Sequence, residues 1–222
     1  MGKYDAYRNR LLASGATHQM DMMNSTKRQA ASYIMNSPSL SHVSLDRNET
    51  TIPAIASDDN LPNTKRFLFL PDTEVNIGDY VYYEGNHYLA TRRNYDTIYP
   101  ELRCELCNWN FRLIIGESKI IVDRDPQGRP IYDTIRDVAD FPCVLDTKVY
   151  SALSNEVMAL PAGAMIIKMP HDPEHLVEIN YDVQVRNMEY QVTEVNYENV
   201  INDIGFIEIN LQRVVNKGGF DE

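Results

Sequence analysis

The one metal-like spacing in this chain is a pair of cysteines three positions apart, Cys104 and Cys107. A zinc site needs four ligands, and the remaining donors are Cys143 and the five histidines. Residues 102–115 alternate in a way that predicts a single β-strand, and residues three apart on a strand point to opposite faces. Two thiolates on opposite faces cannot share an ion, so we interpret the cysteines as structural, with metal binding and redox chemistry as alternatives.

A second group of possible ligands is the segment His171-Asp172-Pro173-Glu174-His175. Imidazoles and carboxylates this close together can bind a metal adventitiously. No second ligand cluster stands out elsewhere in the sequence, so the segment is interpreted as a solvated turn. We therefore expect no metal and no cofactor.

Short catalytic motifs are absent from the sequence: there is no GxSxG, no glycine-rich phosphate loop and no HExxH. Carboxylates are too common in an acidic chain to identify a general acid and base. Arg92-Arg93 has the chemistry to bind a phosphate or a carboxylate, but a solvated strand end is the better interpretation. We expect no catalytic residue and predict that the protein is not an enzyme.

The charge of the chain is negative and unevenly distributed. The formal net charge is −11 over 222 residues. Residues 1–40 hold five Lys/Arg and two Asp/Glu, whereas residues 170–222 hold three and eleven. Solubility is the simple explanation of this distribution. The alternative is that the acidic end binds a basic partner surface or faces a molecule that it must not bind. The sequence has no basic stripe interleaved with aromatic residues, so we do not expect it to bind nucleic acid.

Composition also limits the number of domains and indicates the cellular compartment. At 222 residues, 43% of them hydrophobic, the chain fits one large domain or two small ones. It has no run of 18 apolar residues and no apolar signal region, so we expect no membrane contact. Three cysteines without a secretion signal predict synthesis in a reducing cytoplasm.

The organising feature of the fold is a pair of similar hairpin patterns. Residues 77–93 predict two strands around a Gly85-Asn86 turn, and residues 179–195 repeat the plan around Arg186-Asn187. A strict alternation follows the second hairpin, with Ile207, Ile209 and Leu211 on one face. A further hairpin is expected at residues 120–135. The sequence predicts a mainly β protein with two small β-barrel or β-sandwich modules.

Helices are expected only before the β modules. An apolar stripe predicts a short helix over residues 3–14, and Ser25 or Thr26 is positioned to cap a second one that ends at residue 35. The predicted organisation is an N-terminal helical extension at 1–40, a first β module at 41–122, and a second β module with its connecting hairpin at 123–222.

Several segments in this order resemble a known class of proteins. They are YDAYRNRLLASG, STKRQAASYIMNSPS, KRFLFLPDTEVNIGDYVYYEGNHYLA, LRCELCNWNFRL and the closing VTEVN…GFIEINLQRV. This layout is similar to structural proteins of the neck of tailed bacteriophages, which complete the head and connect it to the tail. The resemblance covers most of the chain and is one of layout.

The resemblance implies a non-enzymatic virion protein that forms a ring of its own copies around the DNA channel in the neck. Its partners would be a portal-side adaptor and tail proteins, and DNA would pass through the lumen without sequence-specific binding. The N-terminal helices and the long loops 18–25, 58–64 and 92–101 would make the contacts. The candidate contact residues are Tyr4, Tyr7, Leu11, Tyr95 and Tyr99.

Three alternatives stay open at this point. The protein could belong to the tail or baseplate, where tyrosine-rich β modules also occur. It could be a monomeric β-sandwich that binds a ligand on exposed aromatic residues, or an enzyme with a metal at the cysteines and histidines.

Overall fold

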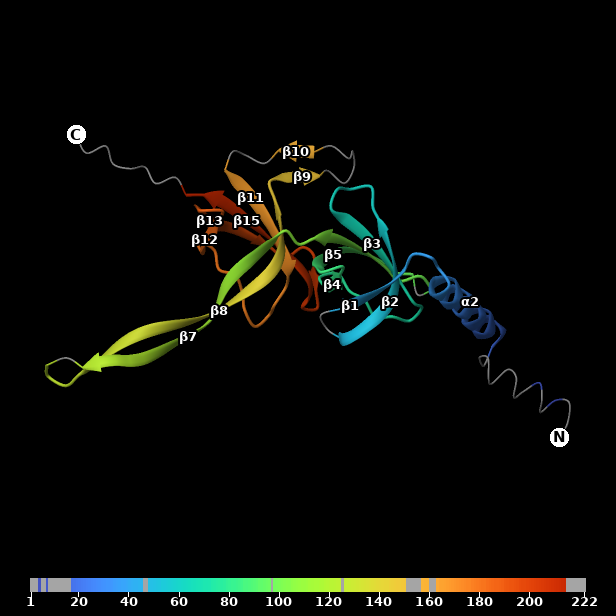
Figure 1. The fold of residues 1–222 in the computed structure, drawn as a ribbon, viewed down its shortest axis with the longest axis horizontal. Coiled ribbons are helices and arrows are strands. Elements are labelled where there is room, and N and C mark those ends of the chain that lie inside the picture. Colours follow the sequence, from blue (N-terminus) through green and yellow to red (C-terminus); the bar gives the residue numbers. More distant parts are fainter. Residues whose placement is uncertain are drawn as a thin grey trace. The chain divides into compact units, whose positions relative to one another are not determined.

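The computed structural model describes residues 4, 7, 17–45, 48–96, 98–124, 126–150, 157–159 and 163–214. The chain is mainly β, as predicted, and divides into two compact units, Met1–Leu106 and Cys107–Glu222 (Figure 1). No helix in the described part of the chain has the length and apolar character needed to cross a membrane.

Unit 1 consists of a helix and a six-stranded barrel. Its elements are α2 (His18–Met35), β1 (Leu40–Leu45), β2 (Asn48–Asp58), β3 (Thr64–Phe69), β4 (Tyr80–Tyr83), β5 (Asn86–Asn94) and β6 (Glu101–Leu106). The strands follow the order β1-β2-β3-β6-β5-β4, and β1 also pairs with β4, which closes the barrel. Closure gives both edges of the sheet a hydrogen-bonded neighbour. The interior is filled by Val43, Leu45, Ala54, Phe67, Phe69, Val75, Val81, Tyr88, Ala90, Leu102 and Cys104.

The predicted hairpin at residues 77–93 is present as β4 and β5, but its turn lies one residue earlier than expected. Positive φ occurs at Glu84 (50°) and Gly85 (81°), whereas Asn86 is the first residue of β5. Two successive positive φ values match the right-handed twist of the flanking strands. Asn86 supports the turn instead through its side-chain amide, which donates to the carbonyl oxygen of Glu84 at 3.1 Å.

The N-cap of helix α2 lies eight residues before Ser25, the nearer of the two predicted caps, Ser25 and Thr26. Its N-cap is Thr17, whose extended backbone (φ −134°) and hydroxyl oxygen, which accepts from the backbone N–H of Met20, meet the usual requirement. The methionine-rich segment 18–25, predicted as a loop, is therefore the first half of the helix. Methionine and glutamine are good helix formers, and the Thr17 cap allows the helix to start before them. The helix packs through Ala30 and Ile34, both buried.

The single strand predicted over residues 102–115 is two strands that belong to different units. β6 ends at Leu106, and β7 begins at Trp109 after a break at Cys107 and Asn108. The boundary between the units thus lies after Leu106 and not after residue 122 as expected. Residues 109–124 pair with 130–143, which keeps them in unit 2.

Unit 2 is built on a seven-stranded sheet with the path β12-β13-β15-β11-β8-β7, to which β14 adds by pairing with β15. Its strands are β7 (Trp109–Arg124), β8 (Pro130–Asp146), β11 (Ala164–Pro170), β12 (Asp182–Val185), β13 (Met188–Asn196), β14 (Val200–Ile201) and β15 (Ile204–Arg213); β9 (Lys148–Tyr150) and β10 (Val157–Ala159) form a separate pair. Its order differs from that of the barrel, so the two units share a hairpin pattern and not a common topology.

The C-terminal hairpin and strand confirm the alternation read from the sequence. The turn between β12 and β13 is Arg186-Asn187, with φ of 47° and 64°. The inward side chains of β12, β13 and β15 pack with Val177 and with side chains of β7, β8 and β11 to form one core. This core consists of Phe111, Leu113, Cys143, Leu145, Ile167, Met169, Val177, Val183, Val185, Tyr190, Val192, Ile207, Ile209 and Leu211. One buried and one wet face per strand is the physical meaning of the period of two.

Candidate assembly surfaces

The tyrosines predicted to make contacts lie on the surface. Tyr4, Tyr7, Tyr95 and Tyr99 have exposed side chains, and Leu11 lies outside the described residues. The Arg93 guanidinium stands 4.9 Å from the centroid of the Tyr95 ring and also donates to Asn76 Oδ1 at 3.0 Å. Arg93 is thus half-buried and engaged within unit 1, whereas Arg92 is exposed, so only Arg92 has the solvated environment expected for the pair. The role of the four tyrosines as contacts remains a prediction.

The cysteines divide between the two cores. Cys104 is buried inside the barrel of unit 1, and Cys143 is buried in unit 2. Burial, together with the neighbouring Cys107, raises the pKa of the Cys143 thiol to about 12. A thiol with so high a pKa is neither a good nucleophile nor a ready metal ligand at neutral pH. Among the described residues, no three His, Cys, Asp or Glu side chains gather where they could share a metal ion.

The segment at residues 171–175 forms an internally bonded turn. Asp172 Oδ2 lies 2.8 Å from His175 Nδ1, and Asp172 Oδ1 accepts from the backbone N–H of Glu174 at 2.9 Å. Burial raises the pKa of Asp172, but the hydrogen bonds from His175 and the backbone outweigh it, so the net pKa is lowered. The carboxylate stabilises its own loop, as a structural turn requires.

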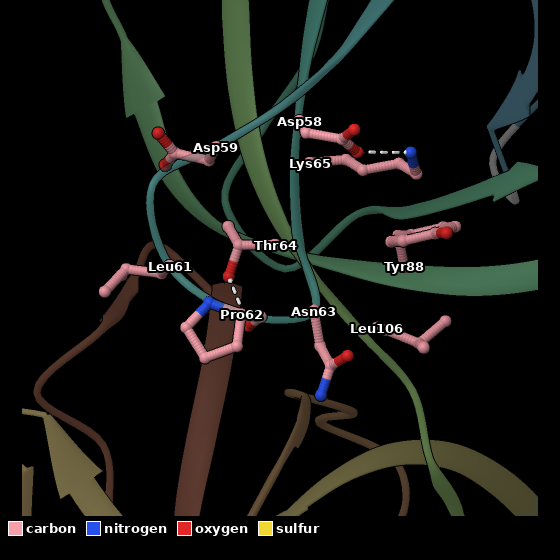
Figure 2. A pocket seen from close by; sticks show the side chains of 9 residues that line it. All are labelled: Asp58, Asp59, Leu61, Pro62, Asn63, Thr64, Lys65, Tyr88 and Leu106. Carbon is pink, nitrogen blue, oxygen red and sulfur yellow. Dashed lines mark hydrogen bonds and ion pairs between the residues drawn. The ribbon is translucent and has the colours of Figure 1, made fainter.

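A shallow hollow of about 370 Å³ lies beside the β2–β3 loop of unit 1 (Figure 2). Its basic side chain, Lys65, donates to Asp58 Oδ1 at 2.7 Å, and this hydrogen bond raises the pKa of the lysine. The Lys65 ammonium also lies 5.8 Å from the centroid of the Tyr83 ring. Its positive charge is therefore already balanced within the protein. The lining residues are Asp58, Asp59, Leu61, Pro62, Asn63, Thr64, Lys65, Tyr88 and Leu106.

Next to this hollow, two arginines stand opposite each other across neighbouring strands. Arg66 in β3 pairs in register with Arg103 in β6, which would be unfavourable without compensation. Asp59 lies 3.5 Å from Arg66 Nε and 3.7 Å from Arg103 Nη1, and Glu101 lies 3.7 Å from both guanidinium groups. Two acids thus face these two arginines, and Arg92 in β5, which pairs in register with Arg103 on the other side, adds a third base to the row.

The first half of α2 leaves apolar side chains in water. Met20, Met22 and Met23 are exposed, whereas the second half of the helix is anchored by Ala30 and Ile34. Lys27, at the junction of the halves, forms an ion pair with Asp72. Flexible methionines suit an adaptable protein contact, so this half-helix is a candidate surface.

A second candidate surface is the far part of the β7–β8 hairpin, which Figure 1 shows extending from the other strands of unit 2. We call residues 117–136 the arm. In the described part of the chain, β8 pairs with β11 only at Val144, Leu145 and Asp146, so the strands of the arm pair only with each other. Six of its apolar side chains are exposed: Ile120, Ile121, Val122, Ile131, Tyr132 and Ile135.

Sequence reasoning found the hairpin but missed its exposure. The hairpin was expected at residues 120–135, and the structure extends it to 109–146. The available signal was the unbroken apolar run Ile120-Ile121-Val122. Such a run normally indicates a strand buried on both faces. Here the same pattern occurs on a two-stranded ribbon that the described residues of unit 2 leave uncovered.

Comparison with known proteins relates this chain to phage sequences. Residues 108–212 match the family model of the YomX C-terminal domain, which begins one residue inside unit 2. Over 178 residues the chain is 21% identical to the SPbeta prophage-derived uncharacterized protein YomX of Bacillus subtilis (strain 168), covering 78% of this chain and 82% of that protein. No solved structure matches the chain. The likeness indicates a phage-derived protein.

Proposed function

Starting from this phage origin, we propose that the protein is a non-enzymatic structural protein of the virion that forms a ring in the neck and joins the DNA-filled head to the tail. The observation that carries the proposal is the arm, a two-stranded ribbon with six exposed apolar side chains. Isolated two-stranded ribbons are marginally stable in water, and exposed apolar patches mark interaction sites. A chain that keeps such an element is built to assemble.

The charge of the chain supports a place along the DNA channel. A formal net charge of −11, concentrated in residues 170–222, would repel the phosphate backbone wherever that surface lines a lumen. DNA could then slide through the ring without adhering to it. The purified chain should therefore not retain duplex DNA even at low salt. Retention that weakens steeply with added salt would contradict this part of the proposal.

A structural role agrees with the ionisable groups as well. The described clusters pair their charges internally, as at Asp58–Lys65 and Asp172–His175, and Cys143 is buried with a raised pKa. Catalytic groups usually show the reverse, with a perturbed side chain directed into a cleft. The proposed partners are further copies of the chain, a portal-side adaptor and tail proteins.

The test is to locate the protein in purified particles of a phage that encodes it. Quantitative mass spectrometry should find several copies per particle, and a tag on the chain should appear at the head–tail joint by electron microscopy. Absence from mature particles would refute a virion role. A tag at the distal end of the tail would favour the tail or baseplate alternative.

A further inference from the structure

We propose that the arm of one copy inserts into a second copy of the same chain and is held there on both of its faces. The proposal rests on the virion function above and deepens it by assigning the contact between neighbouring subunits. It is carried by the register, the dimensions and the charge of the arm.

The register shows that both faces of the arm carry exposed apolar side chains. Residues opposite each other in an antiparallel pair point to the same face, and successive residues alternate. Ile121 lies opposite Tyr132, which places these two side chains on one face. Ile131 and Ile135, two steps either side of Asp133, share the other face with Ile120, the partner of Asp133. A ribbon laid on a surface would need only one apolar face.

The dimensions of the arm point to the same arrangement. Residues 117–124 of β7 extend about 26 Å at 3.3 Å per residue, and a two-stranded ribbon about 10 Å wide offers roughly 260 Å² on each face. A specific interface should bury about 1,000 Å² in total, or about 500 Å² on each partner. One face supplies only half of this area, whereas both faces together reach it. The arm therefore has to be enclosed to form a specific contact.

The charge of the arm favours a second copy as the occupant. The arm holds four basic residues (Lys119, Arg124, Arg129, Arg136) and four acidic ones (Glu117, Asp123, Asp125, Asp133), so the entire −11 resides in the rest of the chain. Any contact between two such acidic bodies would be repulsive. A neutral arm can enter the acidic surface of an identical neighbour without that cost. A basic partner would favour the acidic residues outside the arm instead.

The base of the arm is neutralised in the same way. Arg136 Nε donates to Glu117 Oε1 at 3.0 Å, and Arg112 donates to both carboxylate oxygens of Asp140 at 2.9 and 3.2 Å. Two exposed ion pairs thus lie where the arm joins the rest of unit 2. An arm from one copy in a different surface of the next is a head-to-tail contact, which closes into a ring when the rotation permits.

The experiment measures the mass of the purified full-length chain over a concentration series, with one substitution on each face. Tyr132→Asp places a carboxylate on one face, and Ile135→Asp places one on the other. The matched control is Ile201→Asp, at an apolar residue of unit 2 outside the arm that is 68% exposed. All three positions are exposed, so the variants should fold, and circular dichroism and thermal melting would check this.

We expect the wild-type chain to form assemblies of more than two copies. Each arm substitution should weaken association at least about tenfold, because it buries an unpaired charge, and the control should stay within about twofold of wild type. Sensitivity on one face only would overturn the enclosed arrangement. Equal loss in all three variants would show that added negative charge alone weakens association, which also overturns the proposal.

Particle incorporation separates this inference from the proposed function. If the wild-type chain is monomeric up to about 100 μM and yet the arm variants are lost from particles, the arm binds another protein. That result would overturn the second copy as occupant and leave the virion role intact. If the chain assembles through the arm but is absent from particles, the contact stands and the virion role fails.

Discussion

Ile121 and Tyr132 lie directly opposite each other in the β7–β8 pair, and their side chains are 55% and 58% exposed. Cross-strand apolar pairs stabilise a sheet when a second layer covers them. Within unit 2 this pair has no such cover from the described residues. In the free chain the two side chains are stabilised mainly by their contact with each other. More than half of each side chain stays exposed and can be buried when a partner binds.

The backbone of the arm should therefore be poorly protected in the free chain. In hydrogen exchange on a dilute sample, we expect the amides of residues 117–136 to exchange far faster than those of β15, whose neighbours on both sides are paired strands. Raising the concentration should slow exchange in the arm and leave β15 unchanged. Strong protection of the arm in a verified monomer would contradict its marginal stability.

Two glycines of turns should respond very differently to alanine. A Cβ at Gly205 would lie 2.0 Å from the backbone oxygen of Asn199, so the β14–β15 turn would have to open. At Gly85 nothing lies within 4 Å, and only the positive φ of 81° opposes the change.

Gly205→Ala should cost at least about 3 kcal/mol of stability in unit 2, and Gly85→Ala about 1–2 kcal/mol in unit 1. Thermal melting of each variant against wild type measures which substitution causes the larger loss of stability. Similar losses in the two variants would mean that the close approach at Asn199 relaxes easily.

The thiols should differ in reactivity in the order of their burial. Cys143 is buried, with a pKa raised to about 12, whereas Cys107 is partly exposed. Because the thiolate is the reactive form, alkylation of the native protein at pH 8 should modify Cys107 well before Cys143. Peptide mass spectrometry identifies the modified site, and denatured protein provides the fully reactive reference. Early modification of Cys143 would contradict its place in the core.

The turn at residues 171–175 should lose stability in acid. The pKa of Asp172 is lowered in the folded protein, so its contribution is present above the ordinary carboxyl pKa of about 4 and is lost as the pH falls through the lower folded value. Asp172→Asn should remove that part of the pH dependence. Urea titrations between about pH 3 and 6 on both proteins measure the difference. Parallel curves for the two proteins would show that the turn does not depend on this carboxylate.

Local patterns were enough to predict the elements that depend on neighbours in sequence. The alternation through Val183, Val185, Tyr190 and Val192 identified the inward face of the C-terminal hairpin, and Arg186-Asn187 marked its turn. These features follow from the period of two in a strand and from the positive φ of a two-residue turn. The mainly β class of the fold follows from the same patterns.

Other features of the fold depend on contacts between segments that are far apart in the sequence, and only the tertiary structure decides them. The sequence could not place the start of α2 at Thr17, because helix propensity and capping competed over eight residues. Nor could it end a strand at Leu106, since the pairing of 109–124 with 130–143 is what places the following residues in unit 2. The apolar run at Ile120 predicts burial, and the fold of unit 2 leaves it exposed. Burial of hydrophobic side chains is favourable, so their presence in the sequence predicts that they are covered. Only the packing of the folded chain determines whether the chain itself or a neighbour covers them.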